Sequence, residues 1–203
     1  NIMANLLDSA SILLTPTAYN NGSILAIQPS DGSGDMTFSR GSSATRVNEQ
    51  GLIEDIASNL PRIDYTDGCG NLLLEPQSTN LYLNSDVLVT QSNATGASTY
   101  TVSFYGTGTI TFSGTHTGTL VGTGLNDRVF TTFTTTSGTL VSTISGTCSK
   151  GQLENLTYAT SYIPTSGAIS TRLRDIATNS GIGSLIGQTE GSVFFDLNTT
   201  LKN

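Results

Sequence analysis

Tryptophan is absent from this chain of 203 residues, and histidine, cysteine and cationic residues are scarce. Eight Lys and Arg stand against fifteen Asp and Glu, which gives a net charge of -7 at pH 7. So few cations leave no basic surface for a phosphate backbone, and we expect no nucleic-acid partner. Long apolar runs are also missing. Runs such as 12–14 and 72–74 are far shorter than the roughly 20 residues that span a bilayer, so we expect no membrane insertion.

The sequence contains few residues that could bind a metal or a cofactor. The single histidine, His116, is far from Cys69 and Cys148 in the sequence, so these residues make no metal-ligand cluster. The two cysteines can form a disulfide, although two reduced thiols are the simpler interpretation. Segment 31–35 presents oxygen ligands at alternate positions, as a calcium loop does, but Ser42 occupies the position where that loop needs a bidentate Glu. We predict no metal and no cofactor.

What the chain does contain is typical of β-structure. Short apolar runs alternate with Thr or Ser and are broken by Gly or Asn every eight to twelve residues or so. In segment 100–104, Tyr100, Val102 and Phe104 fall on one face of a strand. The pattern resumes in 110–112 after a Gly-Thr-Gly turn, which predicts a hairpin. Further strands are expected at 119–121, 129–134 and 140–145.

The first third of the chain is less regular. Turn chemistry at 20–22, 30–32 and 67–68 separates short strand-like pieces. Three arginines lie there among Ser, Asn and acidic residues, and we expect them to hold loops together: Arg40, Arg46 and Arg62. Helix is permitted only at 5–11 and 182–186.

These patterns predict an all-β fold in three parts. Residues 1–85 form an irregular β-rich module, and residues 86–175 form an antiparallel, jelly-roll-like β-sandwich. Residues 176–203 are a connector with the first strand of a further domain. Segment 191–197 places Val193, Phe195 and Leu197 on one face, which we expect a continuing domain or neighbouring copies to cover.

Catalytic groups are poorly represented. His116 lies in the tight turn 114–118, and no Gly-x-Ser-x-Gly elbow supplies it with a nucleophile. A glycosidase needs two carboxylates at a controlled separation, for which Asp127 and Glu154 are candidates. Nothing in the sequence distinguishes that pair from solvated surface charge. We predict no catalytic residue and no enzyme.

Sugar binding is an alternative that stays open. Aromatic rings commonly stack on the apolar face of a pyranose, and without Trp only Tyr can provide an exposed platform. Tyr105 is out of phase with the inward-facing set of its strand. The candidate glycan-binding residues are therefore those of the loops around Tyr105, His116 and Asp127.

Several unusual strings occur in a set order along the chain. They are FSRGSSATRVN at 38–48, GLIE at 51–54, NLPRIDY at 59–65, LLLEPQSTN at 72–80, QLE at 152–154 and ATSYIPTSG at 159–167. In this order they resemble bacteriophage virion fibre and tail proteins, notably those of phages and prophages of Bacteroidota. In that family a sandwich resembling a carbohydrate-binding module often precedes a concanavalin-like lectin domain. Segment 186–197 resembles the first strand of that lectin domain.

The resemblance implies a structural subunit of a phage particle, a tail or head fibre that attaches to the virion and presents host-facing domains. Its partners would be other virion proteins of the capsid, collar or tail, with a homotrimer as the usual assembly and a host surface glycan as a further partner. Its location would be the virion, assembled in the bacterial cytoplasm. Two alternatives remain, a host-glycan receptor module and a glycan depolymerase of the tailspike kind.

Overall fold

The computed structural model describes residues 9–187 and 189–194, and nearly all regular structure in them is β-strand. The all-β prediction is confirmed. Within these ranges the one helical element is the short 3-10 turn η1 (Ile182–Ser184), inside the segment where helix was permitted. Most of the other such segment, 5–11, lies outside the described residues.

The chain divides into two compact units. Of the described residues, the sandwich unit comprises 76–173, and the flanking unit comprises 9–75 together with the segment that begins at Arg174. The unit boundaries therefore fall at 75/76 and 173/174, whereas the sequence suggested boundaries near 85 and 175. The segment after Arg174 is part of the flanking unit, so the sandwich is an insertion in it.

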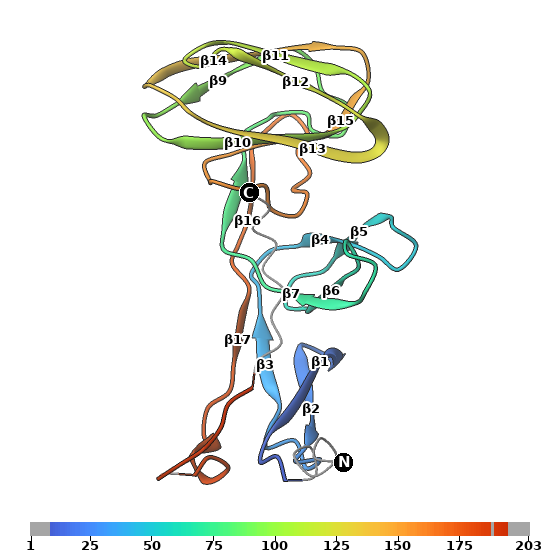
Figure 1. The fold of residues 1–203 in the computed structure, drawn as a ribbon, viewed down its shortest axis with the longest axis vertical. Helices are drawn as coiled ribbons and strands as arrows, with labels where there is room; N and C mark the ends of the chain where they lie inside the picture. The colour runs from blue at the N-terminus through green and yellow to red at the C-terminus, as the bar shows by residue number, and fades with distance from the viewer. Residues whose placement is uncertain (1–8, 188, 195–203) are drawn as a thin grey trace. The chain divides into compact units, whose positions relative to one another are not determined.

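Two antiparallel sheets form the layers of the sandwich unit (Figure 1). One sheet has the order β13 (Gly124–Thr134), β10 (Thr99–Gly106), β15 (Cys148–Glu154). The other has the order β12 (Gly118–Val121), β11 (Thr109–Gly114), β14 (Gly138–Ser145), β9 (Gln91–Thr95). A short ladder joins β8 (Ser78–Asn80) to β16 (Ser170–Arg172) near the two ends of the unit.

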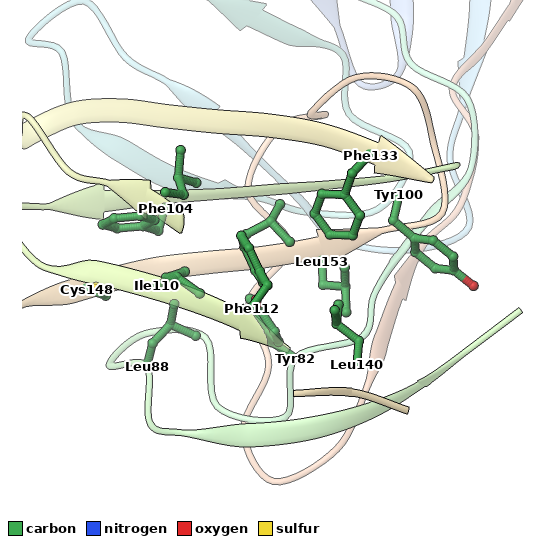
Figure 2. Packing of buried hydrophobic residues seen from close by; sticks show 12 residues of the cluster. Tyr82, Leu88, Tyr100, Phe104, Ile110, Phe112, Phe133, Leu140, Cys148 and Leu153 are labelled. Atoms are coloured by element: carbon green, nitrogen blue, oxygen red, sulfur yellow. The ribbon is translucent and has the colours of Figure 1, made fainter. Parts of the chain in front are cut away.

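The core between the layers follows the predicted alternation. Tyr100, Val102 and Phe104 of β10 are buried, and Ile110 and Phe112 of β11 are buried with them. Figure 2 shows these rings and aliphatic side chains interleaved between the sheets. Each fully buried side chain of this size contributes roughly 1.5–3 kcal/mol relative to an exposed one.

The predicted hairpin between β10 and β11 is wrong. β10 pairs with β13 and β15, while β11 pairs with β12 and β14, so the chain crosses from one layer to the other at 106–108. Gly106 has φ +139°, and a Cβ on it would lie 2.1 Å from the Thr147 carbonyl oxygen. The Gly108 N–H donates to that same carbonyl at 2.8 Å. The two glycines let the backbone pack against Thr147 and pass from one sheet to the other, whereas in a hairpin the chain would stay in the same sheet.

The outer face of β10 is covered. Thr101 and Ser103 alternate with Tyr100, Val102 and Phe104 and so lie on the other face of the strand, yet they are fully buried as well. Thr101 Oγ1 hydrogen-bonds to the Leu156 carbonyl at 2.9 Å, and that carbonyl belongs to the segment that follows β15. The hydroxyl groups on this face of β10 therefore form part of a second, polar layer of packing, on the opposite side of the sheet from the hydrophobic core.

The flanking unit is built from short strands, as predicted. Its four-stranded sheet has the order β1 (Leu13–Asn20), β2 (Ser23–Gln28), β3 (Met36–Ser39), β17 (Ile176–Thr178). Two further ladders are β4 (Ala44–Val47) with β5 (Ile53–Ile56), and β6 (Arg62–Asp64) with β7 (Asn71–Leu73). The turn at 20–22 has two left-handed residues, Asn21 at φ 46° and Gly22 at φ 84°, as Asn-Gly turns between strands require.

The strand expected at 191–197 is described only in part. Residues 191–194 belong to no strand, and Val193 is exposed. Phe195 and Leu197 lie outside the described residues.

Candidate functional site

Buried ions join distant parts of the flanking unit. Arg40 Nη1 lies 3.0 Å from Asp175 Oδ1, Arg62 Nη2 contacts Asp175 Oδ2, and Arg62 Nη1 lies 2.9 Å from Glu75 Oε2. Arg40 also donates to the carbonyls of Ala57 at 2.8 Å and Leu60 at 3.1 Å. The expectation that these arginines hold loops together is confirmed. Because the side chains of both arginines and of Asp175 are fully buried, this cluster is a structural element with no access for a ligand.

The third arginine of this region forms an accessible ion pair. Arg46 on β4 lies opposite Glu54 on β5, and its Nε and Nη2 approach Glu54 Oε1 at 2.7 and 2.6 Å. Asn48 Nδ2 donates to Glu54 Oε2 at 3.2 Å. These donors hold the pKa of Glu54 below its ordinary value of 4.5, Arg46 having the larger effect. Both side chains are partly exposed, so the pair is available to a ligand.

This ion pair borders an open recess of about 350 Å³ in the flanking unit. Its walls are the hairpin of β4 and β5, the end of β6 and the end of β1, which contributes Thr17 and Tyr19. The Val47 N–H donates to Asp64 Oδ2 at 2.8 Å, and the Tyr65 N–H donates to the Val47 carbonyl at 3.0 Å. These bonds fix two of the walls to each other. Sequence reasoning missed the recess because its residues come from three separate segments.

The residues predicted to bind a glycan do not form one site. The Phe133 ring stacks on His116 with centroids 4.0 Å apart and planes 3° apart, and Phe133 pairs with Tyr100 in the ladder. Tyr105 lies five positions after Tyr100 on β10, where it pairs with Arg128, the neighbour of Asp127. At about 3.3 Å per residue, the two places are about 16 Å apart. His116 therefore lies at one end of the ladder, with Tyr105 and Asp127 at the other.

The two candidate catalytic carboxylates also occupy unlike environments. Glu154 is fully buried, and its oxygens accept hydrogen bonds from Ser78 Oγ at 2.6 Å, Gln152 Nε2 at 2.7 Å and Thr160 N at 3.0 Å. Asp127 is exposed on β13. Glu154 pairs across the sheet with Thr101, near the opposite end of β10 from Tyr105. The two carboxylates do not flank a common cleft.

Glu154 belongs to a network that joins strings far apart in the sequence. Asn80 Nδ2 donates to the carbonyls of Gly151 and Ile163, each at 2.9 Å, and its Oδ1 accepts from the N–H groups of Tyr82 and Leu153, each at 3.1 Å. The segments 72–80, 152–154 and 159–167 thus contribute to one buried polar layer of the sandwich unit. In this structure the residues of those strings have an architectural role.

One sheet of the sandwich unit presents a broad uncharged face. The side chains that alternate outward from β12, β11, β14 and β9 are small, and most are exposed; Thr111 lies between Thr119 and Thr143. None of them carries a charge. We call this the threonine face: Ser92, Ala94, Thr109, Thr111, Ser113, Thr119, Val121, Thr139, Val141, Thr143 and Ser145.

Cysteines and carboxylates lie apart from one another in the part of the chain that the structure describes. Cys69 is exposed and Cys148 is buried, and neither is in a disulfide. Asp31 Oδ1 accepts from the N–H and Oγ of Ser33 at 2.9 and 2.6 Å, while Asp35 Oδ1 accepts from the Ala26 N–H at 2.7 Å. Across residues 9–187 and 189–194, no three His, Cys, Asp or Glu side chains gather as metal ligands.

No helix in those same ranges has the length and hydropathy needed to cross a membrane. Comparison with known proteins adds no relative: no family model matches the chain, and neither the curated proteins nor the solved structures contain a significant match.

Proposed function

We propose that this chain is a structural subunit of a bacteriophage particle, a tail or head fibre protein that assembles as a homotrimer and has no enzymatic activity. The observation that carries the proposal is the threonine face, an exposed four-stranded surface without a charged side chain. The order of the sequence strings supports the phage assignment by resemblance. The partners would be capsid, collar or tail proteins, and the location would be the virion.

The charge distribution favours association through the sandwich unit. Within residues 76–173, three acidic side chains are balanced by three basic ones, so the net charge of -7 comes from the rest of the chain. A neutral unit can approach its copies without repulsion, and low net charge promotes association. Its charged residues all lie outside the strands of the sheet that carries the threonine face: Asp86, Asp127, Arg128, Lys150, Glu154 and Arg172. Copies that meet through this face bury hydroxyl and methyl groups without desolvating ions, which would be costly.

The width of the sheet suits a threefold axis. Four strands spaced about 4.8 Å apart make a face about 19 Å wide. Three such faces arranged as a triangular prism each lie about 5.5 Å from the axis, close to half the roughly 10 Å at which sheets pack. The small Thr, Ser and Val side chains fill a space of that depth. A contact repeated around an axis also offers every copy the same partner surface.

Light scattering on the purified protein at micromolar concentration tests the assembly. We expect a mass of three subunits, and Thr111→Arg should reduce it to one, because three guanidinium groups would meet near the axis. Thr136→Arg, which changes an exposed residue in the turn after β13, is the matched control and should leave the trimer intact. A wild-type mass of one subunit at all concentrations would refute the trimer.

Mass spectrometry of purified phage particles tests the location. We expect peptides of this chain in mature virions, and their absence would refute the virion assignment. The two alternatives have weaker support, because the candidate glycan residues lie at two separate places and Glu154 is enclosed by its hydrogen-bond donors.

A further inference from the structure

The recess beside Arg46 and Glu54 is not used by the proposed function. At about 350 Å³ it falls within the range of small-molecule sites, roughly 300–1,000 Å³. Two tyrosines line it, Tyr19 from β1 and Tyr65 just after β6, together with Asn48. Its lining therefore combines tyrosine rings with side chains that can form hydrogen bonds.

The groups that line the recess are held in place before any ligand arrives. Asn48 Oδ1 accepts from the N–H groups of Gln50 at 3.0 Å and Leu52 at 2.9 Å, which fixes the carboxamide in the turn between β4 and β5. The Tyr65 ring packs so tightly on Gly70 that a Cβ there would lie 2.9 Å from Tyr65 Cζ. Little conformational entropy would be lost when such groups bind, which is a condition for useful affinity at a small site.

The charges in the recess select against ions. Arg46 and Glu54 neutralise each other, and the exposed Glu49 adds one negative charge, so an anion gains no net attraction. A cation is attracted by Glu49 and Glu54, but it would have to bind next to the Arg46 guanidinium, which repels it. An uncharged ligand meets no repulsion from these groups, and no charge on the ligand has to be desolvated when it binds.

The hydrogen-bonding groups of the recess also limit the class of ligand that it can bind. Guanidinium and carboxamide N–H groups donate, and the neighbouring Glu54 carboxylate accepts. Adjacent hydroxyl groups can satisfy both requirements at once, because each hydroxyl both donates and accepts. Tyrosine rings pack against the C–H face of a sugar ring. We propose that this recess of the flanking unit binds a neutral monosaccharide residue of a glycan, with vicinal hydroxyls on the Arg46–Glu54 pair and Tyr19 and Tyr65 against the ring.

The ionic state of the site is stable across a wide range of pH. The lowered pKa of Glu54 keeps the carboxylate charged to a lower pH than an ordinary Glu side chain, and a guanidinium stays protonated throughout. Binding is therefore expected to be constant from neutral pH down to the ordinary pKa of a Glu side chain.

Saturation-transfer NMR on the full chain tests the site with neutral probes, namely the methyl glycosides of glucose, galactose, mannose and N-acetylglucosamine. We expect saturation transfer to at least one of them at millimolar concentration. N-acetylneuraminate, an anion, and choline, a cation, should give none. Silence with all four neutral glycosides, or equal signals from the ions, would overturn the proposal.

Variants locate the binding. Tyr19→Ala and Arg46→Lys should each weaken it about tenfold, since they remove a stacking surface and a forked donor respectively. Tyr158→Ala, which truncates a partly buried tyrosine of the sandwich unit, is the matched control and should bind as wild type does. Circular dichroism of each variant checks folding. Unchanged binding in Tyr19→Ala and Arg46→Lys, or loss of binding in Tyr158→Ala, would overturn the assignment.

This inference does not depend on the proposed fibre function. Light scattering on the same sample reports assembly separately from sugar binding. A trimer that binds no glycoside would overturn only the proposal of a sugar site in the recess. A monomer that binds a glycoside would overturn only the proposal of a trimeric assembly.

Discussion

Arg40 Nη1 donates to Asp175 Oδ1 at 3.0 Å across 135 positions of the sequence, and both side chains are fully buried. Asp175 also pairs with Arg62, and its backbone N–H donates to the Glu75 carbonyl at 3.0 Å. One carboxylate therefore joins the second segment of the flanking unit to the first, beside the points where the chain leaves for the sandwich unit and returns.

Removing that charge should destabilise the flanking unit severely. Asp175→Asn leaves two buried guanidinium groups without their shared carboxylate, and breaking a buried pair costs about 3–5 kcal/mol. Urea unfolding followed by circular dichroism should show the loss. Asp55→Asn, an exposed carboxylate on β5, is the control and should change stability by no more than about 0.5 kcal/mol. Equal effects of the two substitutions would contradict the role given to Asp175.

The insertion should fold by itself. Its core lies between its own two sheets, and the β8–β16 ladder holds its two ends together. We expect a fragment of residues 76–173 to give the same amide chemical shifts, away from its ends, as those residues show in the whole chain, and to unfold cooperatively. A fragment with collapsed shift dispersion would show that the sandwich unit needs the flanking unit to fold.

Acid should weaken the sandwich unit through His116. Burial on Phe133 lowers the pKa of His116 from its ordinary value of 6.5, so the unfolded chain binds the proton more tightly than the folded one. The stabilising contribution is complete above pH 6.5 and is lost as the pH falls through 6.5 toward the folded pKa. His116→Phe keeps an aromatic ring and should reduce the loss of stability between about pH 7.5 and 5.5. Thermal unfolding at both pH values measures it, and an identical pH dependence in the variant would exclude His116 as the source.

The corner between the sandwich layers should tolerate no side chain. Gly106→Ala places a Cβ 2.1 Å from the Thr147 carbonyl oxygen, at a φ that L residues rarely adopt, so we expect a loss of about 2–3 kcal/mol. Gly96→Ala is the control within the same unit, because its Cβ would meet only Tyr100 Oη at 3.9 Å. Denaturant midpoints of the two variants compare them, and a stable Gly106→Ala would mean that the corner can relax.

What the sequence determines by itself is local. The alternation in 100–104 placed Tyr100, Val102 and Phe104 on the core face correctly, because side chains on a strand alternate whatever the strand pairs with. The Asn-Gly turn at 20–22 was predictable for a similar reason, since left-handed backbone favours those residues.

Tertiary structure decided the rest, because pairing and burial depend on which distant segments meet. The Gly-Thr-Gly at 106–108 permits both a hairpin and a crossing between layers, and only contact with Thr147 selects the crossing. Thr101 and Ser103 alternate with the core residues of β10, yet both are fully buried: Thr101 Oγ1 bonds to the Leu156 carbonyl after β15, and Ser103 Oγ accepts from Arg128 Nη2. Arg46 and Glu54 occur in the sequence as ordinary charges. They border a recess only because β1, the β4–β5 hairpin and the end of β6 come together in the folded unit.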